Sequence, residues 1–371
     1  MISIADVNEP YGSTIRPLQL AKHLVRLGVE TLQIGERLPG DNKDLETLSF
    51  QDYVNTRYEE LFQIVLAKCR EFSPDIIYSH QIFSSVRFGR RLGRILKRPH
   101  VFDIHSSMAL EIPTYNHLTI KNKVWLLLYE AILLHASNKT IVPSLELRDY
   151  LVKKYRVSPE KILIVKNGVE TDRFRPNAAD LSLRNALGIP SGARVVVFTN
   201  PRLHTFPTNE MALRSFFKMI PAIERRVPSI RFLILGGGPA LESPSKNVIY
   251  TGFVEDLAAH INLADVCVAP FPREAVCGGT RNKVCEYLAS GKPLVATREA
   301  MRGFEDAVEG KHFLLGEEAE DFVYKIVYCL HNQDAATQIG QNARLLSARY
   351  DWGYLTRQLR ALLEEVAGSW T

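Results

Sequence analysis

The sequence alternates between strand-like and helix-like segments along nearly its whole length. Short apolar runs predict strands buried on both faces, and the amphipathic patterns between them predict helices. Such alternation is typical of parallel sheets covered by helices on both faces. The strands are too many for one open sheet, so we predict an α/β protein with two doubly wound domains. The expected strands are 2–7, 31–35, 75–79, 100–105, 139–142, 162–166, 194–199, 230–236, 247–250, 265–270 and 293–297.

The boundary between the two domains is predicted where loop-forming residues interrupt this alternation. Proline, glycine, asparagine and serine gather within 176–193, and such clusters mark loops. We therefore expect a first domain over 1–180, a second domain over 190–350 and a last helix within 351–371. Ligands of doubly wound sheets bind outside the carboxyl ends of the strands, so functional residues are sought there.

Composition excludes several classes of protein. No apolar run is long enough for a helix that spans a bilayer. The net charge of +5, with 46% hydrophobic and 23% charged residues, is ordinary for a globular chain and does not favour nucleic-acid binding. The start of the chain resembles a strand more than a signal peptide. The five cysteines form no Cys-x-x-Cys pair, which indicates reduced thiols and a cytoplasmic protein.

The most informative motif follows the predicted strand 265–270. Between this strand and the helix predicted after it lie Gly278, Gly279 and Thr280. Arg281 and Lys283 come directly after them. Helix N-termini carry unpaired N–H groups and a partial positive charge, and glycine lets a phosphate approach closely. Two further cations suit a diphosphate. The motif predicts a site for a nucleoside diphosphate, although a tight turn before a solvated helix face would use the same residue types.

Glu286 lies further along the same predicted helix, and its carboxylate could accept hydrogen bonds from ribose hydroxyls. The stretch from Gly278 to the Gly-Lys-Pro turn at 291–293 resembles the donor-binding segment of glycosyltransferase family 4. The family's usual motif has two glutamates eight positions apart, and here Gly278 stands in place of the first. The match is closest to the branch that carries Gly-Gly-Thr-Arg. The Asn167-Gly168 turn with Phe174 and Pro176 resembles a second family signature.

The resemblance implies a GT-B fold, with Rossmann-like acceptor and donor domains, and further site residues. Arg202 matches a family arginine that contacts the donor diphosphate. His105 matches a histidine near the transferred sugar, which makes it the candidate catalytic residue. Gly12 falls in a segment similar to the glycine-rich first loop, which faces donor or acceptor. No Asp-x-Asp motif occurs, so we expect no metal and no cofactor, with positive groups neutralising the leaving diphosphate.

These features together predict a hexosyltransferase-type glycosyltransferase. It would move a sugar from a nucleoside-diphosphate sugar to a hydroxyl of a glycan or lipid-linked acceptor, with retention at the anomeric carbon. Two alternatives are a GT-B sugar-nucleotide epimerase and a catalytically silent GT-B subunit that only binds nucleotide. The sequence names neither the sugar, the base nor the acceptor.

A basic stretch in the first domain bears on the acceptor. Residues 87–98 carry six basic side chains and no acidic one. Such a segment is either a solvated helix face or a surface for anionic lipid. The second possibility predicts a cytoplasmic protein in peripheral contact with an anionic membrane.

Overall fold

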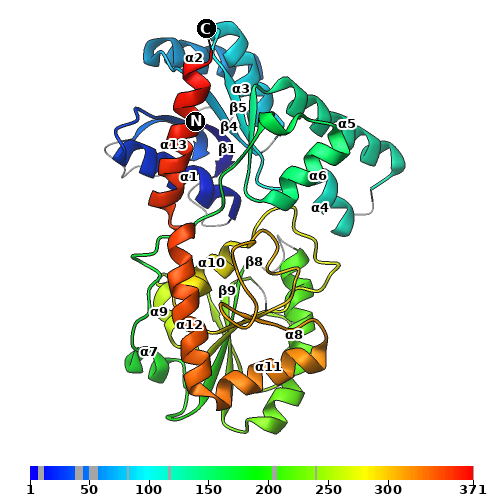
Figure 1. Ribbon diagram of the computed structural model, residues 1–371, viewed down its shortest axis with the longest axis vertical. Helices are drawn as coiled ribbons and strands as arrows, with labels where there is room; N and C mark the ends of the chain where they lie inside the picture. The colour runs from blue at the N-terminus through cyan, green and yellow to red at the C-terminus, as the bar shows by residue number, and fades with distance from the viewer. Residues whose placement is uncertain are drawn as a thin grey trace. The chain divides into compact units, whose positions relative to one another are not determined.

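The computed structural model forms two compact units (Figure 1). It describes residues 1–6, 12–37, 45–49, 57–81, 83–115, 118–202, 207–238 and 240–370. The first unit contains Met1–Asn167, Gly278–Thr280 and Trp352–Thr371. The second contains Gly168–Cys277 and Arg281–Asp351. Each unit is built around one parallel sheet, so the predicted pair of doubly wound α/β domains is confirmed.

The sheet of the first unit has the order β3-β2-β1-β4-β5-β6-β7. Its strands pair in parallel, and the order reverses next to β1, as it does in doubly wound sheets. The strands are β1 (Ile2–Asp6), β2 (Leu32–Arg37), β3 (Glu46–Ser49), β4 (Ile77–His80), β5 (His100–Asp103), β6 (Lys139–Val142) and β7 (Ile162–Ile164).

Helices pack against both faces of this sheet. On one face, apolar residues of α2 and α3 form a cluster with β1, β2 and β4, and residues of α5 and α6 form another with β5, β6 and β7. On the other face, residues of α1 and α13 pack against Tyr78, Val101 and Ile141. The helices are α1 (Gly12–Arg26), α2 (Tyr58–Phe72), α3 (Phe83–Leu96), α4 (Met108–Tyr115), α5 (Ile120–Ala136), α6 (Leu145–Tyr155) and α13 (Trp352–Gly368).

The last helix, α13, belongs to the first unit although its sequence follows the second. It lies beside α1 (Figure 1). Trp352, Leu355 and Leu359 are buried there in one cluster with Leu20 and Leu24 of α1. Burial of these large side chains stabilises the position of the helix.

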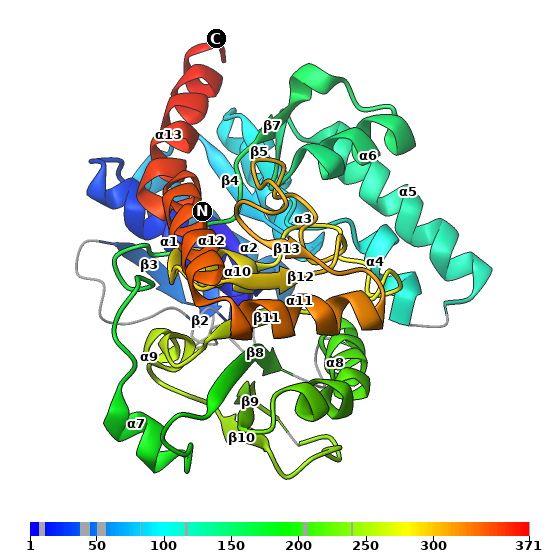
Figure 2. The ribbon, with the colours of Figure 1, turned by 60° about the horizontal axis from the view of Figure 1, so that its bottom comes forward.

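The sheet of the second unit has the order β10-β9-β8-β11-β12-β13, again with parallel pairing. Figure 2 shows β8, β9 and β10 side by side. The central strands are buried on both faces, which explains their continuous apolar sequence. The strands are β8 (Arg194–Arg202), β9 (Ile230–Gly237), β10 (Val248–Gly252), β11 (Val266–Ala269), β12 (Leu294–Ala296) and β13 (Leu314–Leu315).

The helices of the second unit enclose one large apolar core. They are α7 (Leu181–Ala186), α8 (Pro207–Arg226), α9 (Leu257–Asn262), α10 (Asn282–Ala289), α11 (Ala319–His331) and α12 (Gln333–Ser347). In the described part of the chain there are also two short 3₁₀ segments, η2 (Pro159–Lys161) and η3 (Ala348–Tyr350). Among the described residues, no helix combines the length and apolar character that crossing a membrane requires.

The change from one unit to the next lies earlier than the sequence suggested. The first continuous stretch of the first unit ends at Asn167, whereas the expected boundary fell within 176–193. The reason is packing, because Val169, Phe174 and Ile189 are buried in the core of the second unit. The loop-forming residues of that stretch instead flank α7, a short helix that the sequence pattern did not reveal.

Candidate functional site

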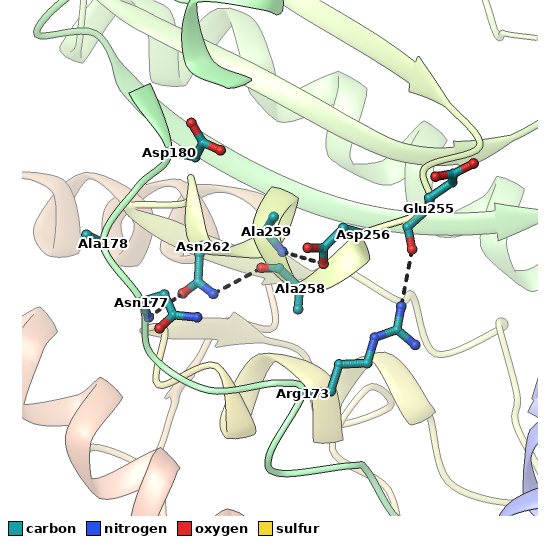
Figure 3. A pocket seen from close by; sticks show the side chains of 9 residues that line it. All are labelled: Arg173, Asn177, Ala178, Asp180, Glu255, Asp256, Ala258, Ala259 and Asn262. Carbon is teal, nitrogen blue, oxygen red and sulfur yellow. Dashed lines mark hydrogen bonds between the residues drawn. The ribbon is translucent and has the colours of Figure 1, made fainter. Parts of the chain in front are cut away.

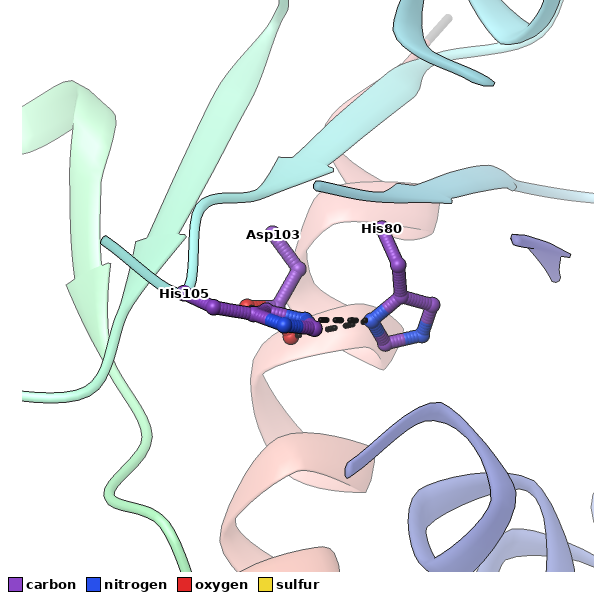
Figure 4. Close-up of side chains that lie close together, drawn as sticks. All are labelled: His80, Asp103 and His105. Carbon is purple, nitrogen blue, oxygen red and sulfur yellow. Dashed lines mark hydrogen bonds and ion pairs between the residues drawn. The ribbon is translucent and has the colours of Figure 1, made fainter. Parts of the chain in front are cut away.

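Three polar side chains meet at the carboxyl ends of β4 and β5 in the first unit (Figure 4). His80 ends β4 and is paired in register with Asp103, which ends β5. His105 follows two residues later, and its Nε2 lies 3.1 Å from His80 Nδ1. The Asp103 carboxylate is 3.7 Å from His80 Nδ1 and 3.9 Å from His105 Nε2. The predicted catalytic residue, His105, therefore belongs to a small buried cluster.

Asp103 is already paired with a cation. The Arg16 Nε lies 3.1 and 3.0 Å from its two carboxylate oxygens, and the Tyr78 hydroxyl donates to Oδ2 at 2.5 Å. The other nitrogens of Arg16 donate to the Asn167 amide oxygen and to two backbone carbonyls. Arg16 and Asp103 are both buried. This ion pair with satisfied hydrogen bonds fixes the ends of β5 and of the segment after β7.

Both imidazoles are held neutral. Burial lowers the pKa of His105 to about 4, with the Asp103 charge opposing and the Arg16 charge adding to the effect. Burial, His105 and Arg16 lower the pKa of His80 well below its usual value. At neutral pH, one ring nitrogen of His105 therefore donates a hydrogen bond and the other accepts one. The tautomer decides which nitrogen has which role. Its Nδ1 is buried and has no hydrogen-bond partner among the described residues.

The same three residues are the described cluster whose atoms could hold a metal ion. The donor set does not fit one, because Arg16 and Tyr78 occupy the Asp103 carboxylate. A divalent cation there would also lie near the buried Arg16 guanidinium, which repels it. The expectation of a site without metal is consistent with this chemistry, and it remains a prediction.

The predicted glycine motif lies in the loop before α10. Gly278, Gly279 and Thr280 group with the first unit. The Gly278 N–H donates to Glu111 Oε1 at 2.7 Å. A Cβ on Gly279 would lie 2.0 Å from the His105 carbonyl oxygen, so only glycine fits there. The two glycines thus permit close backbone packing within the first unit, and a contact with phosphate remains a prediction.

Lys283 lies in the first turn of α10 in the second unit. Its ammonium donates to the Thr199 carbonyl at 2.6 Å and to Asn209 Oδ1 at 3.0 Å. The rings of Phe198 and Phe271 lie 4.7 and 4.9 Å from the ammonium. Burial and the Arg281 charge lower the pKa of Lys283 to about 7. No carboxylate of the described part of the chain lies within ion-pair distance of it. Its direct contacts are neutral oxygens and ring faces, and Glu286 acts on it only through the electrostatic attraction of its charge.

Arg281 precedes α10 and is largely occupied by the protein. Its Nη2 donates to the Ala275 carbonyl and lies 3.4 Å from Glu299 Oε1. Its guanidinium stacks 3.5 Å above the centre of the Phe271 ring. Glu299 also accepts from the Cys277 N–H at 2.9 Å and pairs with Arg302 at 2.8 Å. Arg281 thus helps to hold the loop before α10, and its predicted phosphate contact is untested.

Glu286 lies one helical turn after Lys283 and is half-buried. Burial raises the pKa of its carboxyl group to about 7, while the charges of Lys283 and Arg173 oppose the shift. In its ionised state, a carboxyl group with a pKa near neutral pH can accept hydrogen bonds from hydroxyl groups. The position is compatible with the predicted ribose contact, which no observation tests.

Two predicted site residues are described only in part. Arg202 ends β8 at its carboxyl end, but its side chain lies outside the described residues. Gly12 is the first residue of α1, so the segment expected to form a glycine-rich loop is helical from Gly12 onward. The residues just before Gly12 lie outside the described ranges.

Several polar residues around these positions were not predicted from the sequence. Asn209 at the start of α8 contacts Lys283, Glu299 anchors the loop of Arg281, and Arg16 neutralises Asp103. The sequence did carry two signals. The Pro-Thr-Asn start of α8 pointed to Asn209, and the position of Asp103 at the end of a strand pointed to a polar site there. Nothing in the sequence pairs Glu299 or Arg16 with its partner, because those contacts join distant segments.

A pocket of about 370 Å³ lies elsewhere in the second unit (Figure 3). Its polar lining includes Arg173, Asp180, Glu255 and Asp256. Asp180 caps α7 and Asp256 caps α9 through backbone N–H groups. Arg173 donates to the Glu255 carbonyl. These groups are engaged in holding loops, and the pocket contains none of the predicted site residues.

Two protein-family profiles match this chain. Residues 12–173 match the profile described as "Glycosyltransferase Family 4". Residues 193–332 match the profile described as "Glycosyl transferases group 1". Each match covers most of one unit.

Individual relatives are similar to the chain at low identity. Sulfoquinovosyl transferase SQD2 of Arabidopsis thaliana is 24% identical over 80% of this chain, which spans 58% of that relative. D-inositol 3-phosphate glycosyltransferase of Corynebacterium aurimucosum is 25% identical over 94% of this chain and 89% of its own length. Among solved structures, HepE of Anabaena in complex with UDP and glucose superposes with a TM-score of 0.75 at 18% identity, covering 98% of both chains.

Proposed function

The chain belongs to glycosyltransferase family 4 and is a glycosyltransferase with the GT-B fold, and from that premise we propose that its donor is a nucleoside-diphosphate sugar. The relatives' names favour transfer over the epimerase and the silent-subunit alternatives. We further propose a hydroxyl acceptor, glycan or lipid-linked, and retention at the anomeric carbon, as the family resemblance implies.

One observation carries the proposal for the donor. Lys283 is a buried cation at the start of α10, with neutral acceptors at 2.6 and 3.0 Å and no carboxylate of the described residues in ion-pair range. A buried charge is costly until an opposite charge meets it. A diphosphate would supply that charge, and the N-terminal N–H groups of α10 favour the same anion. The structural neighbour HepE was solved in complex with UDP and glucose, which supports this choice of ligand.

The proposed roles of the remaining residues follow from their chemistry. Glu286 would accept hydrogen bonds from the ribose, and Arg202, Gly278, Gly279 and Thr280 would contact the diphosphate as the family motif implies. Positive groups would stabilise the leaving diphosphate without a metal ion. His105 would hydrogen-bond the transferred sugar as a neutral imidazole, since burial lowers its pKa to about 4.

Calorimetric titration with UDP and GDP tests the proposal. Lys283→Met should weaken binding by about tenfold to a hundredfold, because a hydrogen bond to a charged group contributes about 1.5–3 kcal/mol. Lys218→Met removes an exposed lysine of α8 and serves as the matched control. Equal affinity of Lys283→Met and the wild type for every nucleoside diphosphate that binds would refute the role of Lys283.

A further inference from the structure

Helix α5 of the first unit exposes an apolar face. Ile120, Val124, Trp125, Leu128 and Ile132 have exposed fractions of 82, 48, 58, 60 and 54%. Their spacing of mostly four residues places them on one side of the helix. We call these five side chains the α5 stripe. The helix runs along the outer edge of its unit (Figure 1).

The opposite side of α5 already provides the contact with the fold. Leu126, Leu133 and Leu134 are buried there, and the last two belong to the core beside α6. The helix is thus apolar on both sides, whereas a surface helix normally turns polar residues outward. Five large apolar side chains in one exposed row are more than the scattered exposure of ordinary surfaces, and they indicate a binding surface.

The charges around the α5 stripe indicate which partner it binds. Lys121 and Lys123 are exposed at the start of the helix. The helix's one carboxylate, Glu130, is buried and accepts from the Ala109 N–H at 3.0 Å. Trp125 stacks on Tyr129 with ring centres 4.9 Å apart. Lysines beside an apolar row with Trp and Tyr match the boundary between anionic headgroups and acyl chains.

We infer that α5 docks the protein on an anionic phospholipid bilayer, with the α5 stripe inserted among the lipids and Lys121 and Lys123 at the headgroups. A protein partner fits less well, because protein interfaces are depleted in lysine relative to the rest of the surface. A second copy packed through the same stripe would also bring the lysines of both copies to one interface.

The basic stretch in α3 is less suited to this role. Arg91 makes two hydrogen bonds of 2.7 Å to the Glu59 carboxylate, and Arg98 pairs with Asp75 at 3.8 Å. Two of its six basic side chains are therefore paired with carboxylates of the protein. Ile95 is exposed to 43%, but it has no apolar row around it comparable to the α5 stripe.

The inference rests on the proposed function in one respect, since a lipid-linked acceptor is what docking would serve. Its test does not depend on sugar transfer. Wild-type protein is sedimented with vesicles of phosphatidylcholine alone and of phosphatidylcholine with phosphatidylglycerol, at low and high salt. Nucleoside-diphosphate affinity is measured on the same samples, so failure of the donor proposal and failure of docking give different results.

The informative variant is Leu128→Gln with Ile132→Gln, because both side chains are exposed and the core stays intact. The matched control, Leu345→Gln, changes an exposed leucine of α12. We expect the double variant to lose at least about tenfold in partitioning to the mixed vesicles, from the apolar area withdrawn from lipid, and the control to lose none. Trp125 emission should shift to the blue on binding, and Trp125→Phe should remove that shift.

Three results would overturn the inference. Wild-type protein that ignores mixed vesicles at low salt has no such surface. Double-variant binding equal to wild type assigns membrane contact to another face. A concentration-dependent dimer that the double substitution dissociates assigns the α5 stripe to a second copy.

Discussion

Replacing Lys283 by methionine should change how stability depends on pH. The pKa of Lys283 is lowered from 10.5 to about 7 in the folded protein. Between these values the folded state binds fewer protons than the unfolded state, so this group makes the free energy of unfolding rise with pH. The slope is about 1.4 kcal/mol per pH unit for one proton. From pH 7.5 to 9.0 the lysine alone should therefore add about 2 kcal/mol, and Lys283→Met should lack this increment.

The effect can be measured as a difference between two melting temperatures. In a unit of this size, 1 kcal/mol corresponds to about 2–4 °C in Tm. On going from pH 7.5 to 9.0, the Tm of the second unit should rise about 4–8 °C more in wild type than in Lys283→Met. Scanning calorimetry of both proteins gives this difference, and the exposed control Lys218→Met should follow wild type. Parallel curves for wild type and Lys283→Met would refute the reasoning, since they would mean that the ammonium is fully compensated in the folded protein.

Three further predictions concern the site. Glu286→Gln should weaken binding of nucleoside diphosphates with both ribose hydroxyls more than of 2′- or 3′-deoxy analogues, and equal calorimetric losses would remove the ribose role. Arg281→Ala should lower the free energy of unfolding by about 1–3 kcal/mol in urea titrations, because it leaves buried Glu299 with one hydrogen-bonded cation fewer; unchanged stability would contradict its role in the loop. Transferase turnover should survive EDTA, whereas loss restored by Mg²⁺ or Mn²⁺ would contradict a leaving group stabilised by protein charges alone.

The fold was predictable because its signals are local. Buried parallel strands such as β11 and β12 read as apolar runs, and α3, α6 and α10 carry helical periodicity between turn signals. The short strands β3 and β13 lie outside the strands expected from the sequence. Two to four residues of strand give too little periodicity to stand out from a loop.

The site was predictable only as a set of positions. Lys283 and Glu286 were identified by their place in a motif, and His105 by the family resemblance at the end of a predicted strand. Their electrostatic states depend on partners that are far apart in the sequence, such as Asn209 for Lys283 and Arg16 for Asp103. Burial decides these states, and burial is a property of the packed chain. The pairing of Arg281 with Glu299 likewise depends on how the chain packs.

The central claim is that the second unit binds the diphosphate of a nucleotide sugar through Lys283. The most direct test is a thermal-shift panel of UDP, GDP, ADP, CDP and dTDP with wild-type protein and Lys283→Met. A ligand that binds only the folded state raises its Tm. We predict that at least one nucleoside diphosphate raises the Tm of wild type and shifts Lys283→Met much less. No shift with any of the five, or equal shifts in both proteins, would contradict the claim.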